Sequence, residues 1–249
     1  MSKKFIFLAK KILFPGLDIG IRKRMKFSKY LKKGEILTLD VGCGNGAFSF
    51  AAYKRGNSVI GIDFDEQKLE RTEKFRDYLG LNPQRCSFKT LNVYKAKVLQ
   101  KKFDQIICFE TLEHLKNDEK VIEIFSQILK ENGILHLCVP YLKRNPYYGE
   151  IISEIEDGNH VRLGYTFEEL EQMLEKSGFK IIKRDTAVGF FAQKLINFNN
   201  WLDLNLLEKY SNRIKDLAHF LSFIFLYPST FLDKFIPSKQ LNIYINAEK

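Results

Sequence analysis

The sequence predicts an α/β fold, a doubly wound and mostly parallel sheet with helices on both faces. Apolar β-prone segments alternate with helix-like segments along residues 34–187, which is the pattern of strand–helix–strand units. The first strand runs into a turn with glycine at three alternate positions, Gly42, Gly44 and Gly46. The second strand ends in an acid, Asp63. A glycine-rich turn between a strand and a helix, followed by such an acid, is typical of sheets that hold a nucleotide-like cofactor.

The expected elements follow one another in order. Strands are expected near residues 36–41, 58–63, 86–91, 103–109, 133–139 and 179–187. Helices are expected near residues 20–32, 47–55, 66–79, 118–130 and 167–177. The last helix has clear end signals, because Thr166 and Glu169 can form a capping box and Gly178 can end the helix. Residues 241–246 alternate apolar and polar side chains as a half-buried strand does.

The composition suits one large domain in a reducing compartment. The chain has 249 residues, of which 45% are hydrophobic. Its four cysteines are scattered, without a C-x-x-C pair. This spacing argues against a disulfide framework and against a zinc site, so we expect a cytoplasmic protein whose cysteines are structural.

The basic charge lies almost entirely in residues 1–33, which we expect to form an amphipathic arm and helix. This segment holds eleven Lys and Arg and one acid, whereas residues 34–249 hold 29 basic and 29 acidic residues. Large apolar side chains such as Phe5 and Phe7 stand between the lysines. A solvated helix face would explain the charge alone, but the interleaving favours an anionic membrane surface over nucleic acid as a partner. Lys10 and Lys11 interrupt the apolar run, so it does not predict a signal peptide.

We expect residues 34–249 to form the main domain. Within it an apolar segment, residues 190–236, separates the sixth expected strand from the last one, and we expect this segment to be a helical insertion. Residues 217–232 carry no charged side chain, but Pro228 interrupts them. A membrane-spanning helix needs about twenty apolar residues, so this run is too short and too broken to span. A helical lid with its own core and an interfacial or substrate-gathering element both fit the pattern.

The stretch Asp40–Gly46 reads D-x-G-x-G-x-G and resembles motif I of the class I S-adenosylmethionine (SAM) methyltransferases. Gly42, Gly44 and Ala47 also satisfy G-x-G-x-x-G/A, so a nicotinamide cofactor is the competing interpretation. Asp40, Gly46 and the residues after the fourth strand favour the methyltransferase. The resemblance covers residues 34–187 and implies an enzyme with a Rossmann-like seven-stranded sheet, its last strand antiparallel beside the sixth.

The same resemblance implies how SAM would be bound. Asp40 would lie near the methionine ammonium, Asp63 would accept both ribose hydroxyl protons, and Phe64 would cover the adenine. Asn92 stands where the family commonly has an acid, and its amide oxygen and the backbone N–H of Val93 could serve the adenine. The expected cofactor-binding residues are Asp40, Gly42, Gly44, Gly46, Asp63, Phe64, Asn92, Val93 and Phe109.

The chemistry is expected in the segment after the fourth strand, where ligands bind in open α/β sheets. Glu110, Glu113 and His114 would share one face of a helical turn. Methyl transfer needs alignment and removal of a proton, and His114 is the first candidate for the general base. The L-E-H-L sequence resembles the branch that includes ubiquinone- and menaquinone-biosynthesis methyltransferases.

A divalent metal is left open. E-x-x-E-H resembles the metal-binding segment of ubiquinone-pathway O-methyltransferases and of small-RNA 2′-O-methyltransferases, and His160 could be the second histidine of such a site. Two carboxylates and two imidazoles would suit Mg²⁺, Mn²⁺ or Zn²⁺. His160, Arg162 and Tyr165 are also candidate contacts to the methyl acceptor. His136 and His219 are expected to be structural.

The predicted function is therefore SAM-dependent methyl transfer to an oxygen of an apolar or amphipathic small molecule at the inner membrane surface. A quinone precursor, a lipid and a lipid-linked glycan all fit as acceptors. The rival hypotheses are an RNA methyltransferase, whose basic arm would bind phosphates in a salt-sensitive way, and a SAM-binding protein without catalysis.

Overall fold

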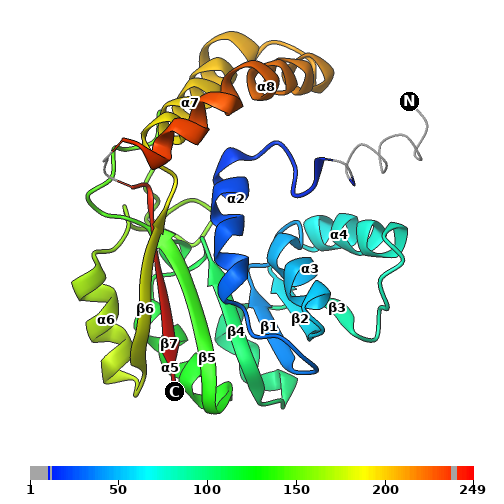
Figure 1. Ribbon diagram of the computed structural model, residues 1–249, viewed down its shortest axis with the longest axis vertical. Helices are drawn as coiled ribbons and strands as arrows, with labels where there is room; N and C mark the ends of the chain where they lie inside the picture. The colour runs from blue at the N-terminus through cyan, green and yellow to red at the C-terminus, as the bar shows by residue number, and fades with distance from the viewer. Residues whose placement is uncertain (1–10, 12, 237–239) are drawn as a thin grey trace.

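The computed structural model describes residues 11, 13–236 and 240–249. The predicted arm falls mainly on residues 1–10 and 12, outside the described residues. The strands are β1 (Leu37–Val41), β2 (Ser58–Asp63), β3 (Cys86–Thr90), β4 (Phe103–Phe109), β5 (Leu129–Pro140), β6 (Lys180–Ala187) and β7 (Asn242–Glu248). They form one sheet in the order β3-β2-β1-β4-β5-β7-β6 (Figure 1). β7 runs antiparallel to both β5 and β6, which confirms the predicted Rossmann-like sheet.

Helices cover both faces of the sheet and bury a separate core on each. One face carries α2 (Ile19–Arg24), the 3₁₀ helix η1 (Met25–Tyr30), α3 (Ala47–Lys54) and α4 (Glu66–Tyr78) (Figure 1). The other carries the 3₁₀ helix η2 (Val93–Leu99), α5 (Asp118–Ile128) and α6 (Phe167–Lys176). Thr166 caps α6, as its sequence predicts, because its hydroxyl accepts a hydrogen bond from the Glu169 N–H at 3.1 Å.

Two element boundaries differ from expectation. The helix predicted over residues 20–32 is split into α2 and the 3₁₀ helix η1, where Phe27 is fully buried and stacks on Tyr244. The helix expected to reach residue 130 ends at Ile128, because Leu129 already pairs with Phe103 of β4 and begins β5. In both places a tertiary contact overrides the local helical pattern.

The segment predicted as an insertion folds as α7 (Phe190–Leu202), the π-helical turn η4 (Asp203–Leu207), α8 (Asn212–Leu226) and the 3₁₀ helix η5 (Tyr227–Lys234). These helices lie beyond the carboxyl ends of the parallel strands (Figure 1). Many of their apolar side chains are exposed, and Phe225 reaches 74% and Phe235, just after η5, 70% exposure. None of the described helices is long and apolar enough to cross a membrane.

Candidate active site

The first cavity, of about 310 Å³, lies at the carboxyl ends of β1, β2 and β4 and beyond β3. The glycine turn forms its floor. Gly42 has a φ of +64°, and a Cβ there would overlap the Thr111 hydroxyl and lie 2.9 Å from its methyl group. Gly44 has a φ of +52°, and a Cβ there would meet no atom closer than 3.9 Å, so its backbone can approach a ligand closely.

Asp63 ties the glycine turn to the end of β2. One of its carboxylate oxygens accepts a hydrogen bond from the Gly44 N–H at 2.9 Å, and the other accepts from the Asp65 N–H at 3.1 Å. The carboxylate also lines the cavity. Each oxygen has further acceptor capacity, so the group can hold the turn and still accept ligand hydroxyl protons.

Three other predicted residues line the same cavity. Phe64 is 68% exposed there, which leaves its ring free to cover a ligand. The side-chain oxygen of Asn92 accepts from the Tyr94 N–H at 2.9 Å and so caps η2, although Asn92 and Val93 both still line the cavity. The structure thus brings together six of the nine predicted cofactor residues: Gly42, Gly44, Asp63, Phe64, Asn92 and Val93.

The remaining three lie outside this lining. Asp40 points under α3, where its carboxyl group accepts a hydrogen bond from the Ser49 hydroxyl at 2.5 Å, and burial raises its pKa to about 7. Gly46 has a φ of +76° and packs against Phe50, where a Cβ would lie 2.9 Å away. Phe109 is buried in the core, its ring centroid 4.4 Å from that of Phe48. Both side chains lie on the face of the sheet that α3 covers, Asp40 against Ser49 and Phe109 against Phe48.

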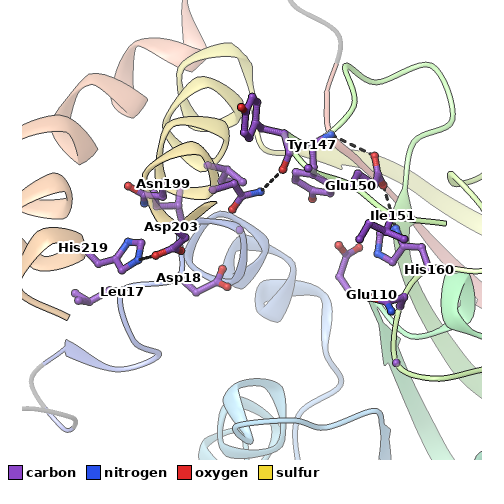
Figure 2. A pocket seen from close by; sticks show the side chains of 18 of the residues that line it. Leu17, Asp18, Glu110, Tyr147, Glu150, Ile151, His160, Asn199, Asp203 and His219 are labelled. Carbon is purple, nitrogen blue, oxygen red and sulfur yellow. Dashed lines mark hydrogen bonds and ion pairs between the residues drawn. The ribbon is translucent and has the colours of Figure 1, made fainter. Parts of the chain in front are cut away.

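A second and larger cavity, of about 700 Å³, adjoins the first. Glu110, His114 and Gly158 line both cavities. The larger one extends from this junction past Asp18 to the insertion, where Asp203 and His219 form a pair at 2.9 Å (Figure 2). A cofactor in the first cavity would therefore meet an acceptor in the second at Glu110 and His114.

Glu113 carries a fully buried carboxylate beside this junction. Neither of its side-chain oxygens has a hydrogen-bond partner among the described residues. One oxygen lies 4.0 Å from Nε2 of His114 and 4.0 Å from Nε2 of His160. Burial, and next the charge of Glu110, raise the pKa of Glu113 well above its usual range. A buried carboxylate in this position requires a proton or a cation to satisfy it.

Hydrogen bonds at the opposite ring nitrogens orient both histidines. Nδ1 of His114 lies 2.9 Å from the Asn159 carbonyl oxygen, which can only accept, so Nδ1 carries the proton. Nδ1 of His160 lies 3.1 Å from a carboxylate oxygen of Glu150 (Figure 2). Burial and the nearby His114 lower the pKa of His160 and keep it neutral. Both Nε2 atoms thus present lone pairs towards Glu113.

Glu150 is itself fixed by Arg144. The guanidinium donates to both carboxylate oxygens, with Nη1 2.9 Å from Oε2, and it also donates to the Leu163 carbonyl at 3.1 Å. Burial opposes ionisation, but the Arg144 hydrogen bonds prevail and lower the pKa of Glu150. An ionised Glu150 can accept only, so it also places the proton of His160 on Nδ1.

Glu110 does not join this group. It has a φ of +49° and precedes the 3₁₀ turn η3 (Leu112–His114), so the predicted shared helical face is wrong for Glu110. Its carboxylate accepts from Arg24 at 3.2 Å and from Asn242 at 2.9 Å. Burial raises the pKa of Glu110, and the guanidinium opposes that rise.

Arg162 and Tyr165, predicted as acceptor contacts, do not line the larger cavity. Arg162 pairs with Asp118 at 3.0 Å, and the buried Tyr165 donates its hydroxyl proton to Asp118 at 2.8 Å. The Tyr165 hydroxyl also lies 3.1 Å from the carbonyl oxygen of Leu112, the residue before Glu113. His136 is structural as expected, since both ring nitrogens are hydrogen-bonded in the core. His219, expected to be structural, lines the cavity instead.

Several lining residues could not be recognised from the sequence. Arg24 looked like one more charge in the basic segment, yet it is buried and reaches Glu110 across 86 residues. Glu150 and Asp203 stand in no motif. Asp203 begins a π-helical turn, a local irregularity that is frequent at functional sites but cannot be read from sequence.

Known protein families and structures resemble this chain in sequence and in fold. Residues 32–178 match the family model of a methyltransferase domain. The mitochondrial ubiquinone biosynthesis O-methyltransferase of Bos taurus is 25% identical over 185 residues, which cover 71% of this chain and 49% of that protein. The ubiquinone biosynthesis O-methyltransferase of Haemophilus ducreyi is 34% identical over 101 residues, which cover 40% of this chain and 43% of that protein. The chain spans about half the length of the curated relatives it matches.

Solved structures share the fold at low sequence identity. The cyclopropane synthase MmaA2 of Mycobacterium tuberculosis has a TM-score of 0.63 at 18% identity, covering 90% of this chain and 82% of that one. A SAM-dependent methyltransferase of Mesorhizobium loti has a TM-score of 0.60 at 16% identity, with 94% and 100% covered. Phosphoethanolamine N-methyltransferase 2 of Haemonchus contortus, in complex with SAM, has a TM-score of 0.60 at 17% identity, with 98% and 56% covered. With the family model matching more than half of its residues, the chain belongs to the SAM-dependent methyltransferase family.

Proposed function

We propose that this chain transfers the methyl group of SAM to a hydroxyl oxygen of an amphipathic small molecule. The observation that carries the proposal is the junction of the two cavities, where Glu110 and His114 line both. A donor and an acceptor bound in these adjoining cavities would meet at the junction. Such binding supplies the alignment that an in-line displacement needs, worth roughly 7–11 kcal/mol in the best cases. The O-methyltransferase names of the relatives support oxygen as the acceptor atom.

The lining of the larger cavity supports an acceptor with a polar head. Hydrogen-bonding side chains come from three separate segments, including Asp18, Asn199, Asp203 and His219. Some of them already pair with each other, as Asp203 and His219 do, but a wholly apolar acceptor would remove water from their remaining donor and acceptor atoms, which costs free energy. A quinone precursor with free hydroxyls, a polar lipid head or a lipid-linked sugar would each satisfy them.

The acceptor proton would leave through the group formed by Glu113, His114 and His160. Their ligand atoms all lie within 4.8 Å of one another, and the unpartnered Glu113 carboxylate fits a divalent cation. When bound, such a cation lowers the pKa of an acceptor hydroxyl. His114 lines both cavities and holds its proton on Nδ1, so its one free lone pair, on Nε2, can serve in either of two ways. Without a cation it would take the acceptor proton as general base; with a cation it would be a ligand, and the hydroxyl proton would pass to solvent. Glu150 and Asn159 keep the two imidazoles oriented for these roles.

We further propose that the protein works at an anionic membrane surface. The excess positive charge lies in the first 33 residues, and the insertion beside the acceptor cavity exposes many apolar side chains. Together they form the pairing of cations with bulky apolar groups that favours the headgroup region of a bilayer. An amphipathic acceptor could then enter the cavity from the membrane side.

Calorimetric titration with S-adenosylhomocysteine tests the cofactor assignment. Wild type should bind with micromolar affinity, and Asp63→Ala should lose most of that affinity because the ribose acceptor and the anchor of the glycine turn are both removed. Asp77→Ala, at the other end of α4, is the control and should bind like wild type. Absence of binding to wild type would contradict the proposal. A positive result leads to an acceptor screen with lipid extracts and with RNA, and RNA methylation would overturn the small-molecule assignment.

A further inference from the structure

A third cavity, of about 530 Å³, lies away from the active site, between α2, α3 and η5. Three cationic side chains line it, Arg22, Lys54 and Arg55. Phe14 and Tyr227 add aromatic surface to the same lining. No motif and no part of the proposed mechanism accounts for three cations around one hollow.

The cations are held in place but not neutralised. Arg22 donates to the Gly16 carbonyl at 2.6 Å, and Arg55 donates to the Leu31 carbonyl at 2.8 Å. Within the part of the chain that the structure describes, no carboxylate oxygen lies within 4.0 Å of any of the three cations. Neutral carbonyls fix the direction of a guanidinium and leave its charge available, so the cavity attracts an anion.

The cavity is continuous with the exposed apolar surface of the insertion. The Arg22 guanidinium lies 4.7 Å from the centroid of the Phe223 ring and 5.9 Å from that of Tyr227. Tyr227 both lines the cavity and begins η5, which also carries the exposed Phe231. An anion bound here would thus have an apolar surface beside it. A free inorganic anion makes no use of such a surface, whereas the hydrocarbon part of an amphiphile can pack against it.

We propose that this cavity binds the phosphate group of an anionic membrane lipid, with the lipid's chains directed along the apolar face of α8 and η5. The charge of the chain complements such a leaflet, because all of the +10 net charge arises in its first 33 residues. The inference rests on the membrane-surface part of the proposed function and is independent of methyl transfer. If the cavity binds a lipid phosphate, the protein recognises a headgroup at a defined site and is not held at the membrane by diffuse charge attraction alone.

Vesicle sedimentation with the full chain tests the site. Lys54→Glu is the test variant, because the Lys54 side chain is exposed and its ammonium, 5.9 Å from the Phe14 ring centroid, forms no hydrogen bond or ion pair with the described residues. Lys101→Glu, exposed ahead of β4, is the charge-matched control. We expect wild type to bind phosphatidylcholine vesicles containing phosphatidylglycerol. Each lost cation weakens such binding about fivefold, so Lys54→Glu should bind at least about fivefold more weakly than the control. Thermal melting checks that both variants fold.

The other outcomes separate the alternatives. Equal weakening by Lys54→Glu and Lys101→Glu would overturn the site and leave a diffuse electrostatic attraction to the membrane. Absence of vesicle binding by wild type would overturn both the site and the membrane proposal, without touching the binding of S-adenosylhomocysteine. Titration with inorganic phosphate is the second arm. Saturable phosphate binding lost in Lys54→Glu, without vesicle binding, would assign the cavity to a free phosphate compound and overturn the lipid assignment.

Discussion

The two sides of the active site are built in different ways. The cofactor side is formed by short loops that directly follow β1, β2 and β3, so the residues lining it are close in sequence to the strands that place them. The acceptor side is assembled from α2, the loop after β5 and the insertion, which are brought together only by the tertiary fold. Its contacts join residues as distant as Arg24 and Asn242.

The difference follows from the two tasks, which are binding a cofactor and selecting an acceptor. Binding the same cofactor needs a fixed glycine turn and a carboxylate at a strand end, which a rigid parallel sheet supplies locally. Selecting an acceptor depends on loops and added helices, where variation costs the sheet little. Glu110 and His114 stand where the two sides meet, and the variants below test how far the sides are independent.

The largest effect is expected from Glu113→Gln. The amide would offer N–H donors to the two Nε2 lone pairs, so the variant should fold at least as well as wild type but lose affinity for a divalent cation. Methyl transfer should fall by about 10²–10⁴-fold, the range of a lost proton-transfer group. Affinity for S-adenosylhomocysteine should stay unchanged, since Glu113 does not line the cofactor cavity.

Calorimetry with Mg²⁺, Mn²⁺ and Zn²⁺ on both proteins measures the first effect directly. His219→Ala is a useful companion, because His219 lines the acceptor cavity at its far end and should change acceptor affinity without changing cation binding. Cation binding that is equal in Glu113→Gln and wild type would show that the cluster is not the metal site. Loss of cofactor binding in Glu113→Gln would break the separation of the two sides.

The second effect concerns Asp40, a buried carboxyl group on the cofactor side. Its pKa is about 7 in the folded protein against an ordinary 3.8, so from about pH 4 to pH 7 the native state holds a proton that the unfolded chain has released. The free energy of unfolding therefore falls as the pH rises through this window, by about 1.4 kcal/mol for each pH unit. Asp40→Asn does not titrate and should gain stability relative to wild type up to pH 7.

Urea unfolding across this pH range, without cofactor, measures the difference between the two proteins. The gap should stop widening above about pH 7, where Asp40 is ionised in both states. A constant gap at all pH values would mean that Asp40 is ionised throughout. Repeating the series with S-adenosylhomocysteine tests the prediction that Asp40 acts near the methionine ammonium, because a nearby cation would stabilise the ionised form and flatten the curve.

The sequence predicted the cofactor side well because the information there is contiguous. The glycine turn, Asp63 and the alternating elements are readable over a few residues each, and the family resemblance supplied the antiparallel β7. Asp40 and Phe109 show the limit of this reasoning. Both stand at the right place along a strand, but the face to which each side chain points depends on how the strand is packed.

The acceptor side could not be predicted in the same way. His160 was found because it resembled the second histidine of a known motif, whereas its partners Glu150 and Arg144 lie in a loop without a regular pattern. Arg24 was hidden among ten other cations, and its burial depends on Glu110 being beside it. The role of such residues depends on contacts between segments that are far apart in the chain. These contacts leave no local pattern in a single sequence.

The third effect is expected at Glu150, which acts on the site through His160. Glu150→Gln removes the charge that orients Nδ1 of His160, and changes of this kind typically lower metal affinity by about 10–100-fold. Glu154→Gln, in the same loop and exposed, is the matched control and should bind cations like wild type. Glu150→Asp, which keeps the charge, should recover part of the affinity. Equal cation affinity in Glu150→Gln and the control would mean that Glu150 does not act on the metal site and only stabilises the loop.

The smallest effect tests the rigidity of the cofactor side. Gly42→Ala and Gly80→Ala both place a side chain at a positive φ, +64° and +69°, which costs an L-residue roughly 1–2 kcal/mol. The environments differ, because a Cβ at Gly42 would overlap the Thr111 hydroxyl while one at Gly80 meets nothing within 4 Å. Both variants should lose stability through the shared strain, but only Gly42→Ala should also lose affinity for S-adenosylhomocysteine, since Thr111 lines the cofactor cavity. Equal cofactor affinity in the two variants would mean that the turn adapts, and the cofactor side would then be as plastic as the acceptor side.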